Sequence, residues 1–401
     1  MRYLFIFSIF LFFSACQKHQ TKLVLEVPEL LERSHKLQYS IEWSETKNRF
    51  ADLKHKLKQE PENIESKLQL CNLYISEARI TGEHGYYYPA ALAMTESILA
   101  NKELKKDDEF MALSFKASVQ LSLHDFKNAL TTAQKAVQLN PHNAQIYGSL
   151  VDAYVELGNY DVAVEYADKM VSIRPDLRSY SRISYLREIH GLIDESIEAM
   201  KMAVEAGSPG SEEKSWAALQ LAQLCFRYDK VREAESILNQ ILTERDDYPF
   251  AIAALAEINV KEKNYEKAER RLIEACQIIP EVSFCVNLAE IYKIQNRQEE
   301  LDSILLVIKE MLNDDIANGH NMSLEYSKLF LDFYSDPTKA MEYIKKDLEM
   351  RPNNIDINLL LAKIYTFSKD KEKAEFAIEK AMATNSKNPE IIEISNELKA
   401  L

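Results

Sequence analysis

The most constraining feature of this 401-residue chain is a pattern of apolar and small residues that recurs at a fixed spacing. Pro141 and Pro175 are 34 residues apart, and similar side chains precede each of them. In the clearest unit, 144–177, Leu150 and Tyr154 are four residues apart and therefore share one helix face. The other pattern positions of this unit are Tyr147, Val151, Gly158, Tyr160, Ala163 and Ala167.

Each unit is typical of two short helices joined by a turn. Gly158 and Asn159 favour the turn, and Ala163 and Ala167 are small enough to let the paired helices approach closely. Pro175 then ends the second helix. One hairpin of this kind cannot bury its apolar face alone, so neighbouring hairpins must stack. The chain is therefore expected to form one elongated helical array, although its length alone would suggest two or three domains.

This pattern resembles the tetratricopeptide repeat, a 34-residue helix–turn–helix unit with small and aromatic residues at set places. Tyr147 stands where the family has tryptophan, Val151 replaces a small residue, and Ala167 replaces an aromatic one. The resemblance implies an all-α solenoid, wound as a right-handed superhelix of about eight repeats plus a partial one. Further units match over 113–141, 177–210, 215–248, 255–280, 288–305, 326–352 and 361–381, with a less regular one at 70–98 and a partial one at 50–61.

Three segments depart from the repeat. We expect the solenoid to cover 45–388, with an insertion at 80–89 and an irregular connection at 313–323. The last segment, 389–401, is expected to be a capping helix, polar outside and apolar inside.

The N-terminal segment predicts an export signal. Arg2 supplies a positive charge, the residues from Tyr3 to Phe13 are almost all apolar, and two small residues precede Cys16. The apolar run is shorter than the roughly 20 residues that a membrane-spanning helix needs. The cysteine makes the segment resemble a bacterial lipoprotein signal, with Phe13 in place of the usual leucine. A plain secretory signal or an ordinary apolar helix are the alternatives.

The lipoprotein interpretation implies removal of 1–15 and acylation of Cys16, with 16–44 as lipidated tether and entry segment. We expect attachment to a bacterial envelope membrane through this lipid. The outer membrane, on its periplasmic side, is favoured because 17–20 lacks the acidic run that marks surface export in some envelopes.

The charge and the motifs exclude several function classes. Lys and Arg number 49 against 63 Asp and Glu, a net charge of −14, which disfavours a nucleic-acid partner. No nucleophile elbow, phosphate loop, dinucleotide fingerprint or metalloprotease motif is present, and the eight histidines are scattered. We therefore expect no catalysis, no bound metal and no small-molecule cofactor. Cys71 and Cys225 are typical of core residues, while a Cys276–Cys285 disulfide stays open.

The best candidate site lies mid-chain, on two neighbouring first helices, which line the concave surface in this family. Arginine, tyrosine and tryptophan are enriched at binding hot spots. The alternative is that the arginines pair with neighbouring acids and Trp216 seals the 207–214 turn. If the site binds, it would suit a partner with carboxylates and an apolar side chain. The candidate residues are Arg178, Arg182, Tyr185, Trp216, Gln220, Gln223 and Arg227.

A second candidate is the loop expected within the insertion, which carries His84, Tyr86, Tyr87 and Tyr88. These side chains would either contact a sugar or peptide, or fold back and seal the end of the array.

Together these features indicate a lipid-anchored envelope scaffold that binds a protein or peptide through its concave groove. The alternative is a glycan-binding outer-membrane lipoprotein of the starch-utilisation type. The chain has only two tryptophans and only one sizeable insertion, and this small number disfavours that alternative.

Overall fold

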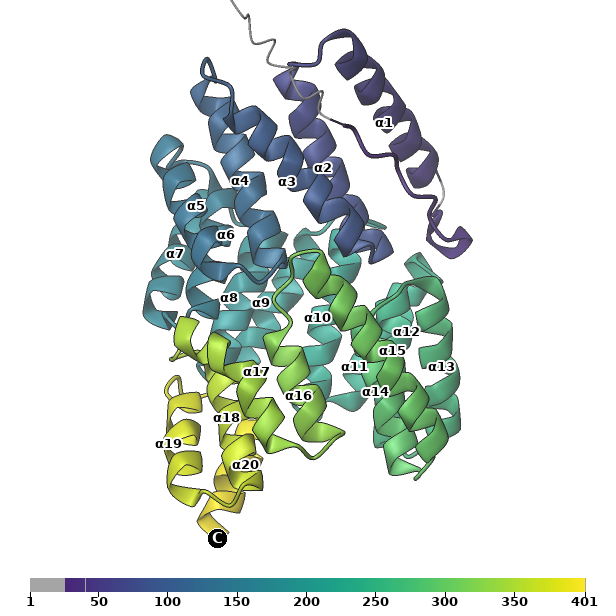
Figure 1. Ribbon diagram of the computed structural model, residues 1–401, viewed down its shortest axis with the longest axis vertical. Coiled ribbons are helices and arrows are strands. Elements are labelled where there is room, and N and C mark those ends of the chain that lie inside the picture. Colours follow the sequence, from purple (N-terminus) through teal and green to yellow (C-terminus); the bar gives the residue numbers. More distant parts are fainter. Residues whose placement is uncertain (1–25, 40, 401) are drawn as a thin grey trace, which may run out of the picture.

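The computed structural model describes residues 26–39 and 41–400, and these residues form an all-α solenoid of twenty stacked α-helices (Figure 1). Cys16 and the apolar N-terminal run lie outside the described residues. Among the residues described, no helix combines the length and apolarity needed to cross a bilayer. The helices are α1 (Glu42–Gln59), α2 (Ile64–Thr81), α3 (His84–Leu99), α4 (Lys106–Ser122), α5 (Phe126–Leu139), α6 (Ala144–Glu156), α7 (Tyr160–Ile173), α8 (Leu177–Ile189), α9 (Ile193–Ala206), α10 (Glu212–Arg227), α11 (Val231–Glu244), α12 (Pro249–Lys261), α13 (Tyr265–Ile278), α14 (Val282–Ile294), α15 (Gln298–Ala317), α16 (Ser323–Asp332), α17 (Pro337–Met350), α18 (Ile355–Phe367), α19 (Lys371–Ala381) and α20 (Pro389–Ala400).

The helices pair into hairpins, from α2/α3 to α18/α19, which makes nine hairpins in the described part of the chain. Helix α1 precedes them and α20 follows them. The all-α solenoid is therefore confirmed, with one more hairpin than the eight expected. Small residues make the close helix crossings possible: Ala129, Ala163, Ala268 and Ala374 are fully buried.

Two segments expected to be irregular are largely helical. Helix α3 begins at His84, so the insertion at 80–89 contributes a two-residue connection and the start of a helix. Helix α15 continues to Ala317 because Leu312 extends its buried face, and the connection after it covers only 318–322. The C-terminal helix α20 buries Ile391 and Leu398, as expected for a helix that closes the array.

The solenoid winds so tightly that its second turn rests on its first. The Tyr160 hydroxyl accepts a hydrogen bond from the Ile355 amide at 2.8 Å, across 195 residues of sequence. Arg351 pairs with Glu156 at 2.6 Å, also 195 residues away. His124 Nδ1 lies 3.0 Å from the Asn321 carbonyl oxygen, at a separation of 197 residues. The nearly constant offset shows that one superhelical turn takes just under 200 residues.

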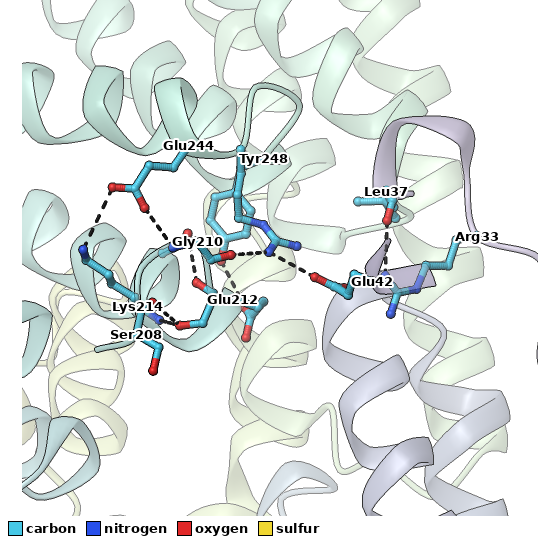
Figure 2. A network of polar contacts seen from close by, with 12 residues as sticks. Arg33, Leu37, Glu42, Ser208, Gly210, Glu212, Lys214, Glu244 and Tyr248 are labelled. Carbon is cyan, nitrogen blue, oxygen red and sulfur yellow. Dashed lines mark hydrogen bonds and ion pairs between the residues drawn. The ribbon is translucent and has the colours of Figure 1, made fainter. Parts of the chain in front are cut away.

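The segment before α1 and the start of α1 contact residues that are about 200 positions later in the sequence (Figure 2). Arg33 binds Glu77 of α2 through two hydrogen bonds of 2.6 and 2.9 Å, and it binds Glu42 at 2.7 Å. Glu42 also pairs with Arg245 at 3.4 Å, and Arg245 donates to the Gly210 carbonyl at 3.1 Å. We call Arg33, Glu42 and Arg245 the N-terminal clasp.

The clasp changes the interpretation of 16–44. Residues 26–39 are not a free tether, because Leu37 is buried in the same apolar core as residues of α12 to α14. Lys36 adds ion pairs to Asp247 and Glu274 at 2.9 and 3.1 Å. This segment therefore belongs to the folded body and joins the first hairpin to helices α11 to α13.

Candidate binding cavity

A cavity of about 920 Å³ lies inside the first turn of the superhelix. Its walls come mainly from first helices of successive hairpins, namely α2, α4, α6, α8, α10, α12 and α14. We call it the central cavity. All seven residues of the mid-chain candidate site line it: Arg178, Arg182, Tyr185, Trp216, Gln220, Gln223 and Arg227. The structure thus brings the predicted residues together, and their binding role stays a prediction.

Capping residues at the starts of α8 and α10 fix where these two helices of the wall begin. Asp176 caps α8 in a reciprocal capping box with Ser179, and the Ser211 side chain accepts from the Lys214 amide at the start of α10. Arg178, Arg182 and Tyr185 then follow at spacings of four and three residues, which places them on one face of α8. The opposite side of each helix packs in the core, as buried Ser184 and Ala218 show.

The arginines of the wall are already paired. Arg182 makes two hydrogen bonds to Asp152, of 2.8 and 2.5 Å. Arg227 pairs with Glu188, and Arg178 lies 3.6 Å from Glu213. The alternative interpretation of these arginines, pairing with neighbouring acids, is therefore the one observed. Each guanidinium of this wall therefore already has a carboxylate beside it.

Carboxylates of this wall titrate above their ordinary range. Burial raises the pKa of Glu212, although Arg79 across the cavity and the Tyr248 hydroxyl at 3.2 Å both oppose the shift. Burial likewise raises the pKa of Glu281 at the start of α14. At the end of α6, outside the cavity lining, burial raises the pKa of Glu156 to about 7, in spite of its pairing with Arg351. The interior thus holds carboxylates in a weakly solvating environment.

Aromatic side chains provide the apolar part of the cavity. Trp216 is 44% exposed, and its ring meets Phe250 edge-on at 5.5 Å between centroids. Tyr185 is 40% exposed on the neighbouring helix. Exposed rings inside a partly open, partly polar cavity are suited to an apolar side chain of a ligand.

The second candidate set is mostly core. Tyr87 and Tyr88 are buried in α3, and the Tyr87 hydroxyl accepts from the Leu31 amide at 3.0 Å. Tyr86 donates to the Glu29 carbonyl at 2.8 Å, outside the cavity. Of this set only His84 lines the cavity, stacked on Tyr88 at 5.3 Å. The three tyrosines therefore fold back onto the N-terminal segment, which is the structural alternative given for them, and they do so from the first turns of a helix and not from a loop.

The described residues offer no group of three His, Cys, Asp or Glu side chains placed to hold a metal ion. Cys71, Cys225, Cys276 and Cys285 are all free, which answers the disulfide left open by the sequence.

The protein families that match this chain are helical repeats, in agreement with the hairpins described above. Two tetratricopeptide-repeat family models match the chain, one over residues 120–187 and the other over 355–388. The chain contains tetratricopeptide repeats. The two matched segments cover α5 to α7 and most of α8, and α18 with α19, which include the wall of the central cavity that carries Arg178 and Arg182.

The curated relatives are similar to this chain only in part. Human aspartyl/asparaginyl beta-hydroxylase is 24% identical over 185 residues, covering 46% of this chain and 24% of that protein. A small glutamine-rich tetratricopeptide repeat-containing protein 2 of Saccharomyces cerevisiae is 29% identical over 94 residues, covering 23% of this chain and 27% of that protein. The chain thus spans about a quarter of the length of each.

Solved structures show distant similarity. The pilF structure of Pseudomonas aeruginosa has 15% identity and a TM-score of 0.41, over 51% of this chain and 93% of that one. The Cut9–Hcn1 structure of the APC/C has 13% identity and a TM-score of 0.48, over 90% of this chain and 61% of that one.

The 34-residue period of the repeat also points to a cavity residue, Phe250, that the sequence analysis did not include. Trp216 and Phe250 are 34 residues apart and occupy the same place in successive repeats. Phe284 follows at the same spacing, and its ring lies 5.6 Å from that of Phe250. The repeat period could therefore have extended the predicted site from Trp216 to Phe250. By contrast, nothing local to α2 indicates that Arg79 reaches the same cavity.

Proposed function

We propose that this chain is a non-catalytic tetratricopeptide scaffold that binds a peptide segment of a protein partner in its central cavity. The observation that carries this proposal is the convergence of all seven predicted groove residues on one cavity with exposed aromatic rings. Tetratricopeptide domains generally bind proteins or peptides, and solenoids use concave surfaces for that purpose. The glycan-binding alternative is weaker, because Tyr87 and Tyr88 are buried and cannot form a sugar platform.

Site-specific cross-linking tests the proposal. A photo-reactive phenylalanine analogue replaces Gln220, which lines the cavity, or Ile273, which is 40% exposed on α13 and outside it. We expect irradiation of cells that carry the tagged chain to link a protein partner from position 220 and not from 273. Equal linking from both positions, or none from 220, would contradict a cavity-bound partner.

We further propose that Cys16 is acylated and holds the scaffold at a bacterial envelope membrane, on the periplasmic side. The signal-like segment before Cys16 supports this. Cys16→Ser should move the chain out of the membrane fraction or leave it unprocessed. Unchanged processing and unchanged detergent partitioning of the variant would refute the anchor.

A further inference from the structure

Trp216 and Phe250, the aromatic pair of the central cavity, lie near the starts of their helices. Trp216 is the fifth residue of α10, and Phe250 is the second residue of α12. Both line the cavity, and their ring centroids are 5.5 Å apart. The spacing of the two rings therefore depends on how the connections before α10 and α12 are held.

A hydrogen bond joins the starts of these two helices directly. Tyr248, the N-cap residue of α12, is 3% exposed, and its hydroxyl donates to Glu212, the first residue of α10, at 3.2 Å. The Tyr248 ring also packs against the Phe250 ring, with 5.7 Å between centroids. A shift of either connection therefore changes the place of the aromatic pair.

Arg245 holds the two connections together. It lies in the connection before α12, and its guanidinium donates to the Gly210 carbonyl, in the connection before α10, at 3.1 Å. The backbone carbonyl of Arg245 accepts from the Tyr248 amide at 3.1 Å. Glu244 adds a second link, because its carboxylate accepts from the Gly210 amide at 3.2 Å (Figure 2).

The countercharge of Arg245 comes from the other end of the chain. Arg245 is 2% exposed, and Glu42 at 3.4 Å is the one carboxylate within ion-pair distance of it among the residues that the structure describes. Removing one partner of a buried ion pair leaves an uncompensated charge, which is strongly unfavourable. Without Glu42, the guanidinium has to move toward water and so release the Gly210 carbonyl.

We propose that Glu42 and Arg245 are positioning residues of the central cavity, which set the spacing of Trp216 and Phe250 that a bound partner requires. This inference rests on the proposed function. It makes the start of α1 part of the binding machinery, although none of the described residues before α2 lines the cavity. The two positioning residues are 203 positions apart in the sequence.

Fluorine NMR of the full chain tests the positioning. The chain has two tryptophans, so labelling with fluorotryptophan gives two resonances, and that of Trp216 is identified by its loss in Trp216→Phe. We expect Glu42→Gln and Arg245→Met to shift the Trp216 resonance, because the ring changes its place against Phe250. Arg245→Lys keeps the charge and should keep the resonance close to its position in the unmodified chain.

Arg351→Met is the matched control. Arg351 is 5% exposed, pairs with Glu156 and Asp347 at 2.6 and 3.0 Å, and does not line the cavity. Its substitution also breaks buried ion pairs, so it should lower the melting temperature and leave the Trp216 resonance in place. Where Arg245→Met does not fold, Glu42→Gln decides, because the Glu42 side chain is 36% exposed.

Cross-linking from position 220 measures what the positioning does for binding. At equal amounts of protein in cells, we expect Glu42→Gln and Arg245→Met to lower the yield of linked partner about fivefold, the lower end of the coupling found between sites. Arg351→Met should retain the yield of the unmodified chain.

An unmoved Trp216 resonance in both Glu42→Gln and Arg245→Met, or an equal shift in Arg351→Met, would overturn the inference. A shifted resonance with undiminished cross-linking would overturn it as well, because the ring spacing would then not matter to the partner. If the unmodified chain links no partner from position 220, the proposed function fails, and the Trp216 resonance alone then decides whether Glu42 and Arg245 position the ring.

Discussion

At the scale of single residues, Gly158 shows how the second turn constrains the first. Its φ of +75° lies in the left-handed region, but the corresponding turn positions of other hairpins tolerate larger residues. Those positions are His124, Asp229, Lys263, Asn296 and Lys369, with φ between 56° and 64°. Glycine is required at 158 for a different reason: a Cβ there would lie 2.5 Å from the Asn353 carbonyl carbon.

We therefore predict unequal effects of two glycine substitutions. Gly158→Ala should lower the free energy of unfolding by about 2–4 kcal/mol, since left-handed strain adds to overpacking between turns. Gly210→Ala is the matched control, because its φ is +71° and no atom lies within 4 Å of the added Cβ. It should cost about 1 kcal/mol. Urea unfolding measures both, and equal losses would show that the turn-to-turn contact adds nothing.

At the scale of elements, a histidine cluster marks where α3 meets the connection between α15 and α16. The His84 ring lies 5.3 Å from Tyr88 and 6.1 Å from His320. Burial lowers the pKa of His84 to about 4, and the charges of His320, Arg79 and His124 add to the effect. Burial also lowers the pKa of His320. These side chains are therefore neutral in the folded protein near neutral pH.

Acid should loosen this junction. The unfolded chain protonates His84 near pH 6.5, whereas the folded chain does so only near pH 4. Its contribution to stability is thus present above pH 6.5 and is lost as the pH falls toward 4, by about 2 kcal/mol at pH 5. His84→Gln should remove that part of the acid sensitivity, which unfolding curves at pH 7.5, 6 and 5 would reveal.

Glu156 should have the opposite effect on the pH dependence of stability, which provides a check on the sign expected for His84. Its raised pKa, about 7, makes its contribution decline as the pH rises from 4.5 to 7, opposite to that of His84. An identical pH dependence of the unmodified chain and His84→Gln would contradict the assignment to His84.

At the scale of the whole molecule, the tight superhelix brings first helices from α2 to α14 around one cavity. Contacts across 195 to 198 residues stack the two turns, and the N-terminal clasp joins the first hairpin to helices α11 to α13. Arg245 is central to the clasp: it is 2% exposed, pairs with Glu42, and lies 3.9 Å from the Tyr39 ring centroid.

Arg245→Met should therefore destabilise the clasp by about 1–3 kcal/mol, because the Gly210 carbonyl and Glu42 lose a charged donor. We expect faster hydrogen exchange in residues 26–39 and α1, with α18 and α19 unchanged. Arg270→Met is the control, since Arg270 is largely exposed in an ion pair within α13 that contributes little. Exchange that rises uniformly along the chain would indicate general destabilisation instead of clasp opening.

The sequence by itself determined the repeated unit. The 34-residue spacing, the small residues at helix crossings and the helix face shared by Arg178, Arg182 and Tyr185 are local properties, readable from neighbouring residues. They were sufficient to predict the helical hairpins, their stacking and the seven side chains that meet at the central cavity.

Only the tertiary structure decided how the array closes. The small rotation between neighbouring repeats accumulates over the chain, so no single repeat encodes the contact of Glu156 with Arg351 or of Gly158 with Asn353. The N-terminal clasp, the helical start of α3 and the pairing of wall arginines likewise depend on partners distant in sequence or on neighbouring helices. The repeat period determines which helix face a residue occupies, whereas the closure of the superhelix determines which residues that face contacts.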